Sequence, residues 1–177
     1  MIKLMYIDGY NRMGYLRSDE CDLLDSLLES NQGISDSELR DLRANHPYAS
    51  VREDNIHLKV KKLTYYTKYD TKLSNFILSK FGYTNLEIDF LYKITYSKGE
   101  HMNYHRDKGS SVKTILVLLN DDFEGGELFV NERNVKLNKR GKYIEFDGNL
   151  NPHEVTKVTK GVRNVLAIFL QKIKTSI

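Results

Sequence analysis

Residues 88–107, IDFLYKITYSKGEHMNYHRD, decide the fold that the sequence predicts. Apolar and polar side chains alternate from Ile88 to Tyr96, with Ile88, Phe90 and Tyr92 on one predicted face, and this is the period of a half-buried strand. The stretch ends on His105-Arg-Asp107, and side chains two residues apart point to the same face of a strand. We therefore expect a strand-rich region that begins here and offers two metal ligands on one face.

Further short strands, separated by turn residues, are predicted downstream. They cover residues 103–107, 113–120, 127–130, 133–137, 142–146, 154–158 and 162–171. Many short strands at this spacing favour a closed or double-sheet β architecture. The jelly roll is the form of this architecture that commonly hosts a metal site.

The amino-terminal half is predicted to be richer in helix. The expected elements are a strand pair at 1–16 with a turn at Asp8-Gly9, a helix capped by Ser18, a second short helix with a capping box of Ser35 and Glu38, a strand at 56–63, and a third helix between Asp70 and Gly82. The expected fold class is α+β, mainly β. We expect one domain over 1–177, in which a helix-rich support at 1–87 packs on one sheet of a jelly-roll core at 88–171.

Composition excludes several classes of function. The formal charge is only +3, from 27 basic and 24 acidic residues, which argues against a nucleic-acid partner. Cys21 is the single cysteine, so neither an intrachain disulfide nor a cysteine-based zinc site can form. The first eight residues lack the apolar core of a signal peptide, and no stretch is long and apolar enough for a membrane helix. We expect a cytoplasmic protein with no membrane partner.

Four side chains in the carboxy-terminal half suggest a metal site. His153 follows His105 by 48 positions, and Arg163 comes ten later at the head of the apolar run 165–170. Two imidazoles and one carboxylate form the facial triad that holds non-haem iron(II) with open positions. An arginine that opens a buried strand requires an anion, because its charge is expensive to bury unpaired. Singly, each residue has an ordinary alternative as a surface or loop side chain.

The surrounding motifs make these residues more specific. The pieces, in order, are Tyr96-Ser-Lys-Gly99, His105-Arg-Asp107, Leu119-Asn120, Phe123-Glu-Gly-Gly-Glu-Leu128, Gly141 leading to Phe146, His153-Glu-Val155, Val158 and Gly161-Val-Arg163. Over residues 92–170 the sequence resembles the prolyl 4-hydroxylase branch of the iron(II)- and 2-oxoglutarate-dependent dioxygenases.

The resemblance implies a double-stranded β-helix with helices on one sheet. His105, Asp107 and His153 would ligate Fe(II), and 2-oxoglutarate and O2 would fill the open positions. Arg163 would pair with the distal carboxylate of 2-oxoglutarate. Tyr96 would donate a hydrogen bond to the co-substrate, and the pocket would be lined by Leu128 and Ala167. The co-substrate would become succinate and CO2 as the substrate gains a hydroxyl, and ascorbate would support turnover.

Three positions depart from the family pattern. Met102 and Leu118 stand where the family often has tyrosine, and Lys157 stands where a proline is common. The metal ligands and Arg163 are unaffected, so these departures concern co-substrate and substrate binding. The missing hydroxyl would be replaced by Tyr143, Thr114 or a water molecule.

The favoured substrate is a residue in a protein or peptide, with proline as the first choice, lying near Phe169 and the loop at Asp121-Asp122. A free amino acid or another small metabolite is the alternative. A nucleic-acid dealkylase would carry a second arginine six residues after Arg163, where this chain has Phe169. A silent binding module is expected to lack a metal ligand, and all three are present.

Overall fold

Strands are the main regular elements of the described residues, and they form two facing sheets and a third sheet of only two strands. The computed structural model describes residues 5–7, 11–31, 33–35, 38 and 58–174. In chain order the elements are β1 (Met5–Ile7), β2 (Asn11–Tyr15), α1 (Ser18–Ser30), β3 (Ile34–Ser35), β4 (Leu58–Lys59), β5 (Lys62–Tyr66), α3 (Thr71–Phe81), β6 (Leu86–Tyr96), β7 (His101–His105), β8 (Lys113–Leu118), β9 (Glu124–Gly125), β10 (Leu128–Val130), β11 (Arg133–Asn134), β12 (Lys142–Phe146), β13 (His153–Val155), β14 (Val158–Lys160) and β15 (Arg163–Lys172).

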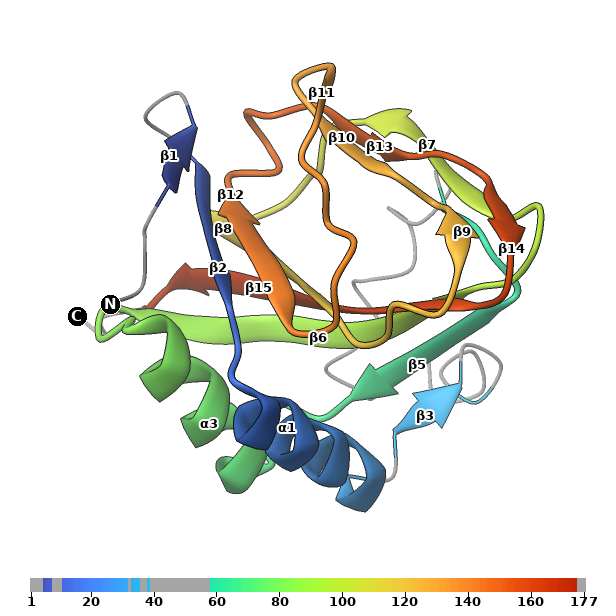
Figure 1. Cartoon of the computed structure of the whole chain (residues 1–177). Helices are drawn as coiled ribbons and strands as arrows, with labels where there is room; N and C mark the ends of the chain where they lie inside the picture. Colours follow the sequence, from blue (N-terminus) through green and yellow to red (C-terminus); the bar gives the residue numbers. More distant parts are fainter. Residues whose placement is uncertain (1–4, 8–10, 32, 36–37, 39–57, 175–177) are drawn as a thin grey trace.

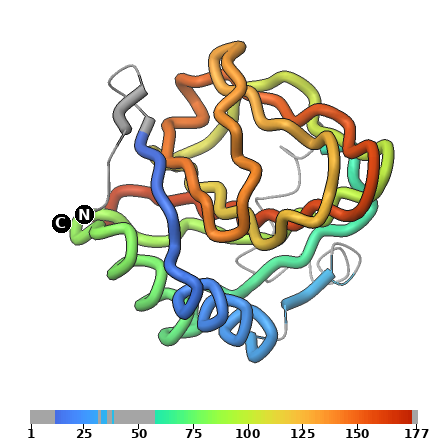
Figure 2. Tube along the Cα trace, in the orientation of Figure 1, coloured from blue at the N-terminus to red at the C-terminus, as the bar shows by residue number. Residues whose placement is uncertain are grey.

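The larger sheet has eight strands in the order β1-β2-β12-β8-β15-β6-β5-β3, and the smaller has five in the order β11-β10-β13-β7-β4. Every described strand pair is antiparallel. The sheets face one another, and α1 and α3 lie beneath the larger one (Figure 1). In Figure 2 the carboxy-terminal half winds around the interior between the sheets. The predicted fold class, a mainly β jelly roll with helices on one sheet, is confirmed.

The larger sheet separates two apolar layers. On β15, Val165, Ala167 and Phe169 belong to the inner layer between the sheets. The alternate residues Leu166, Ile168 and Leu170 belong to the outer layer, where α1 and α3 cover the sheet. Burial on both faces explains why this strand is a nearly continuous apolar run. Arg163 has the parity of the inner set, as the sequence predicts.

A bulge in β6 corrects the predicted alternation. Phe90 pairs with Phe169 and Ile88 pairs with Leu170, so Asp89 is an extra residue in the ladder. Ile88 therefore packs in the outer layer, whereas Phe90 packs against the inner one. The prediction that Ile88 shares a face with Phe90 is wrong, because one inserted residue reverses a period of two.

The predicted strand at 56–63 is two strands that belong to different sheets. Leu58 in β4 pairs with Met102 of the smaller sheet, whereas Leu63 in β5 pairs with Ile94 of the larger one. The chain turns between them, where the Lys61 amide donates to Glu100 Oε1 at 3.1 Å. This corner ties the two sheets together, and alternation alone does not reveal it.

The helix ends follow the capping rules with one correction. Asp70 accepts hydrogen bonds from the amides of Lys72 and Leu73, and Gly82 ends α3 with φ of 70°. The N-cap of α1 is Arg17 and not Ser18, because the Glu20 side chain accepts from the Arg17 amide. The Ser35–Glu38 capping contacts are present, but the predicted second helix lies outside the described residues.

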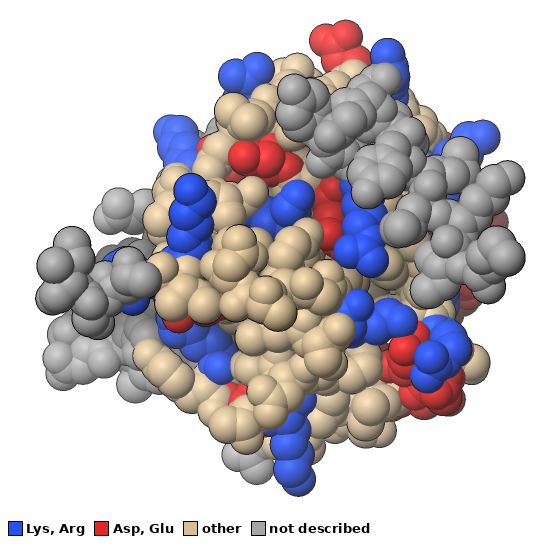
Figure 3. Space-filling view, turned by 90° about the vertical axis from the view of Figure 1, so that its left-hand side faces the viewer, with Lys and Arg blue, Asp and Glu red and all other residues tan. Residues whose placement is uncertain are grey.

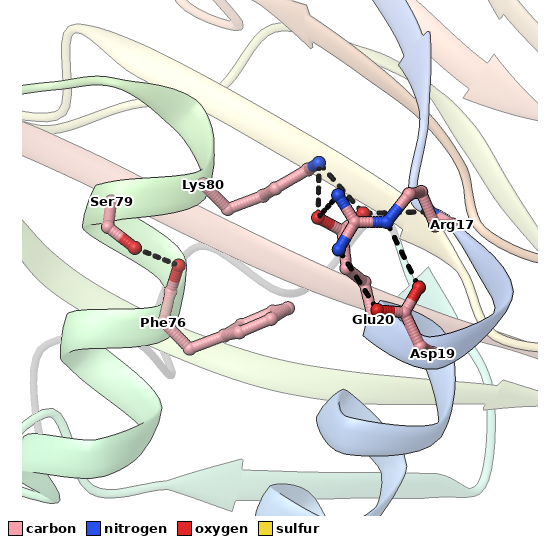
Figure 4. A network of polar contacts seen from close by, with 6 residues as sticks. All are labelled: Arg17, Asp19, Glu20, Phe76, Ser79 and Lys80. Carbon is pink, nitrogen blue, oxygen red and sulfur yellow. Dashed lines mark hydrogen bonds and ion pairs between the residues drawn. The ribbon is translucent and has the colours of Figure 1, made fainter.

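A polar cluster joins the two helices (Figure 4). Lys80 Nζ of α3 lies 2.8 Å from both carboxylate oxygens of Glu20 in α1. Arg17 contacts the same Glu20 and also pairs with Asp19. These contacts hold α1 and α3 beside each other under the larger sheet. Neither α1 nor α3, the helices that the described residues form, is long and apolar enough to cross a membrane.

Candidate metal centre

The three predicted metal ligands come together between the sheets. His105 ends β7, His153 begins β13, and Asp107 lies two residues beyond β7. One ligand atom of each residue lies within 4.8 Å of the others. Asp107 Oδ1 is 3.5 Å from Nε2 of His105 and 3.5 Å from Nε2 of His153. Such a group could hold a metal ion between two imidazole nitrogens and a carboxylate oxygen.

Backbone carbonyl groups orient both imidazoles. His105 Nδ1 lies 2.7 Å from the Asn103 carbonyl oxygen, and His153 Nδ1 lies 3.0 Å from that of Asn151. A carbonyl oxygen can only accept, so Nδ1 carries the proton in each hydrogen bond. Nε2 of a neutral ring then has the lone pair that a metal requires.

A bulge in β7 brings His105 to the inner side. His153 pairs with His105, whereas Val155 pairs with Met102. Between these two pairs, β7 therefore contains one residue more than β13. The bulge places both Met102 and His105 inward although they are three residues apart. It also supplies the Asn103 carbonyl that holds the His105 ring. Bulges of this kind re-aim side chains next to active sites.

Asp107 is positioned by a loop and not by a strand, which corrects the predicted strand at 103–107. Its amide donates to the Gly148 carbonyl at 2.9 Å, and Thr114 Oγ1 donates to its Oδ2 at 2.9 Å. Gly148 packs so closely that a Cβ there would overlap Asp107 Oδ2. Thr114 begins the buried part of β8. The larger sheet thus helps to hold Asp107, which follows a strand of the smaller sheet.

The charge of Asp107 is stabilised by its surroundings. Burial raises the pKa of this carboxyl, but protonated His105 and His153, which act as donor and as positive charge while no metal is bound, and the Thr114 hydrogen bond outweigh burial, so the pKa lies below its usual range. The ionised carboxylate is the form that binds a metal.

Arg163 is the second conspicuous group of the inner side. It is 1% exposed, and neither its Nε nor its Nη2 has a hydrogen-bond partner. Its guanidinium carbon lies 5.2 Å from the ring centroid of Tyr96 and 6.0 Å from that of Phe123. Unpartnered donors on a buried cation fit an anionic ligand, as the sequence predicts.

Tyr96 lies opposite Arg163 in the β6–β15 ladder. Burial raises the pKa of its phenol to about 12, partly offset by the charge of Arg163, so the hydroxyl stays protonated near neutral pH. That hydroxyl has a weak acceptor, the Met102 sulfur at 4.0 Å. Burial also lowers the pKa of Arg163. A carboxylate in this region would receive donors from both side chains.

The predicted apolar wall residues lie in the inner layer. Leu128, in the smaller sheet, is 0% exposed, and Ala167, in the larger, is 1% exposed. Gly126 lies against Arg163, since a Cβ there would come within 2.8 Å of Arg163 Cδ. Nothing in the sequence singles out Gly126 beyond its place in a Gly-Gly pair.

Phe169 lies at the end of the larger sheet that is closest to Asp107. It pairs with Thr114, whose hydroxyl bonds to Asp107. Its ring stacks on Phe90 with centroids 4.2 Å apart and lies 5.6 Å from Tyr92. The result is an aromatic surface on the inner side of β6 and β15, which the sequence indicates only through Phe169.

Three predicted residues lie elsewhere or are already engaged. Asp121 follows the far end of β8 from Thr114, and its carboxylate accepts from the Arg140 amide at 3.1 Å. Tyr143 is in the outer layer, where its ring meets Phe81 edge-on at 5.0 Å. The Thr114 hydroxyl is bonded to Asp107. The structure therefore does not bring Asp121 or Tyr143 to the triad, and neither Tyr143 nor Thr114 replaces the missing tyrosine.

Comparison with known proteins agrees with this geometry. Residues 92–171 match the family model described as the 2OG-Fe(II) oxygenase superfamily. No curated protein matches the sequence significantly. The matched segment contains all three candidate ligands and both residues of the Tyr96–Arg163 pair.

Solved structures share the fold at low sequence identity. The viral collagen prolyl hydroxylase of Paramecium bursaria Chlorella virus 1, in its 2OG complex, has a TM-score of 0.65 and 15% identity, with 94% of this chain and 98% of that chain covered. A Pseudomonas putida prolyl-4-hydroxylase has a TM-score of 0.61 and 14% identity, with 94% and 95% covered. A 2OG-Fe(II) oxygenase family oxidoreductase from Burkholderia pseudomallei has a TM-score of 0.62 and 14% identity, with 96% and 88% covered.

The family match, the shared fold and the His-Asp-His group point to the same chemistry. This family uses Fe(II), 2-oxoglutarate and O2. Residues 92–171 therefore match the 2OG-Fe(II) oxygenase superfamily, and the chain as a whole shares the fold of solved prolyl hydroxylases.

Proposed function

We propose that this protein hydroxylates a residue in a protein or peptide, with proline as the first choice, and that His105, Asp107 and His153 hold its iron. The observation that carries the proposal is the inner face of the jelly roll. Two imidazoles and a carboxylate meet there, and the same face carries a buried arginine with unpartnered donors. The donor set fits Fe(II), because two nitrogen ligands and one oxygen ligand leave positions for other ligands.

Bound Fe(II) would supply the site at which 2-oxoglutarate is oxidatively decarboxylated to succinate and CO2 while O2 provides the substrate hydroxyl. The protein's own groups bind and orient. The Asn103 and Asn151 carbonyls fix the two rings, and Thr114 fixes the carboxylate. No general base is needed for this reaction.

Arg163 would hold the distal carboxylate of 2-oxoglutarate through its unpartnered Nε and Nη2, which can donate in parallel. Tyr96 would donate from its protonated hydroxyl, since only a thioether sulfur occupies it now. Leu128 and Ala167 would form apolar walls that exclude water and strengthen the charge pair. Two side chains, Arg163 and Tyr96, would then bind the carboxylate in a site where Leu118 replaces the tyrosine that the family often has.

Three features support a peptide substrate. The structural neighbours include two prolyl hydroxylases. The stacked rings of Phe169 and Phe90 offer an apolar surface at the end of β15 nearest Asp107, which suits a prolyl ring. Figure 3 shows basic and acidic side chains interspersed on the face it presents, without the continuous basic patch that a nucleic acid favours.

The test is iron-dependent succinate production from 2-oxoglutarate in air, with ascorbate as the supporting reductant and with Asp107→Ala as the control. Proline-rich peptides are then screened by mass spectrometry for stimulation and for the gain of one oxygen atom. Stimulation by a free amino acid without any peptide would replace the proposed substrate class. Failure of the anaerobic protein to bind both Fe(II) and 2-oxoglutarate would overturn the proposal itself.

A further inference from the structure

Asn120 brackets Arg163 from both sides along the chain. It lies two residues beyond the end of β8. Its Nδ2 donates to the Val162 carbonyl at 2.7 Å, and its Oδ1 accepts from the Asn164 amide at 2.7 Å. One side-chain amide thus binds the peptide groups immediately before and after Arg163.

The Asn120 side chain extends a backbone ladder that has ended. The β8–β15 pairing stops at Leu118 with Val165, and the last backbone bond runs from the Leu119 amide to the Asn164 carbonyl at 2.9 Å. A carboxamide has the donor and acceptor of a peptide group, so it can continue the ladder by one step. The step that it adds is the one that contains Arg163.

This segment needs support because Arg163 is buried without an anion. A guanidinium in an apolar layer is drawn toward water while its donors are unpaired. The chain reaches Arg163 from Gly161, which has φ of 73°, and from Val162, which is 42% exposed. The chain therefore passes from an exposed residue, Val162, to the buried Arg163 within a single step. A shift of the backbone at 162–164 would move Arg163 directly.

The other side of the segment is tied to β6. Thr95 Oγ1 donates to Asn164 Oδ1 at 2.9 Å, and Arg163 pairs with Tyr96 in the ladder. Asn120 supplies the matching support from β8. With both in place, the start of β15 is fixed between two strands, and the guanidinium is held against Tyr96 and Phe123.

We propose that Asn120 is a positioning residue for Arg163 and thereby sets the affinity for the distal carboxylate of the 2-oxo acid co-substrate. The inference rests on the proposed function, in which Arg163 binds that carboxylate. Asn120 does not touch the co-substrate in this scheme. It keeps the backbone of residues 162–164 in the position from which Arg163 reaches the co-substrate.

The experiment compares two 2-oxo acids that differ only in the distal carboxylate. Calorimetric titrations of the Mn(II)-loaded protein use 2-oxoglutarate and 2-oxopentanoate, which has the same carbon chain without that carboxylate. Asn120→Ala should weaken 2-oxoglutarate about tenfold, roughly the effect of one net hydrogen bond, and change 2-oxopentanoate by less than about twofold. Asn120→Asp should show the same selectivity, because the Nδ2 donor to the Val162 carbonyl and to Asp122 is lost while the acceptor for the Asn164 amide remains.

Asn31→Ala is the matched control. Its side chain also accepts from a backbone amide, that of Thr67 at 3.3 Å, and donates to Asp70 at 3.1 Å, but it lies in the helical layer. It should leave the affinity for both acids unchanged. Thermal unfolding shows which variants fold, and Asn120→Asp decides the question if Asn120→Ala does not.

The outcomes separate this inference from the proposed function. Equal weakening of both acids, or no weakening of either, overturns the role of Asn120 provided that Arg163→Ala weakens 2-oxoglutarate selectively. If Arg163→Ala leaves 2-oxoglutarate binding unchanged, the assignment of Arg163 fails, and the inference fails with it. Selective weakening of 2-oxoglutarate binding in both the Asn120 and the Arg163 variants supports both the inference and the proposed function.

Discussion

Glu145 and Arg163 are both buried charges of the larger sheet, but they lie on opposite faces and have different surroundings. Glu145, in β12, is 0% exposed on the side that the helices cover. Tyr83 donates to its Oε2 at 2.5 Å, and Arg12 Nη1 lies 3.6 Å from its Oε1. Arg163 faces aromatic rings on the inner side, and none of the ion pairs within the described part of the chain includes it.

We propose that the difference separates a charge that serves the fold from a charge that serves a ligand. Glu145 has a hydrogen-bond donor at Oε2 and a counter-ion 3.6 Å from Oε1, both from its own chain, although Oε1 accepts no hydrogen bond. Arg163 has desolvated donors without partners, and the fold bears that expense on the side where the candidate ligands meet. Substitutions on the inner face should therefore change ligand binding more than stability, and substitutions on the outer face should do the reverse.

Asp107→Ala should have the largest effect on the inner face. It removes the only carboxylate of the triad, so metal binding and succinate production should be lost, while the unfolding temperature of the metal-free protein changes little. Co(II) titration followed by absorbance measures the first effect. Glu154→Ala, which changes the acid next to His153, is the control and should bind Co(II) normally. Unchanged metal affinity in Asp107→Ala would remove Asp107 from the site.

Arg163→Met should raise the 2-oxoglutarate requirement about 10- to 100-fold, because a hydrogen-bonded charge pair contributes roughly 1.5–3 kcal/mol. The same change replaces a buried, unpaired charge with an apolar side chain of similar length. The ligand-free variant should therefore be as stable as the wild type or more so. Urea unfolding without ligand tests this, and a clear loss of stability would mean that Arg163 has a structural partner.

Gly148→Ala should weaken metal binding about tenfold or more, because the added Cβ would overlap Asp107 Oδ2 and displace the carboxylate. Gly109→Ala is a matched control in the loop that carries Asp107. Gly109 has φ of 116°, so alanine is strained there, but its Cβ would meet no atom within 4 Å. Co(II) titration of both variants separates displacement of Asp107 from general backbone strain. Equal affinities in the two variants would show that Gly148 does not constrain the ligand.

Gly148 also illustrates the limit of prediction from sequence. The motif pieces around His105, Asp107, His153 and Arg163 indicate the family, the fold and the candidate ligands, because residue types and order carry that information. The contact of Gly148 with Asp107 joins two loops that are distant in sequence. A turn-like motif does not indicate which distant residue packs against it.

The bulges in β6 and β7 cannot be predicted from the sequence for a related reason. A strand period of two predicts faces only while the ladder is regular, and single extra residues in β6 and β7 reverse it. His105 and Asp107 do lie together as predicted, but a bulge and a loop contact bring them there, and not a shared face of one regular strand. Tyr143 lies on the outer face and Asp121 lies beyond the end of β8 opposite Thr114, and the sequence pattern does not show which end or face of a strand meets the metal ligands.

The outer face should respond through stability and pH. Burial raises the pKa of Glu145 above its ordinary value of 4.5, although the Tyr83 hydrogen bond and Arg12 oppose the rise. The folded state then holds this proton more tightly than the unfolded state. The resulting contribution to stability is fully present below about pH 4.5 and is lost as the pH rises through the raised pKa.

Glu145→Gln should remove this pH dependence while its amide oxygen still accepts from Tyr83. The free energy of unfolding of the wild type, measured in urea and compared with the variant, should therefore decline from pH 4.5 upward. Affinities for Co(II) and 2-oxoglutarate should stay the same, because Glu145 faces the helices and the ligands meet on the opposite side. A change in either affinity, at constant stability, would show that the two faces of the sheet are coupled and would break the division between fold and ligand charges.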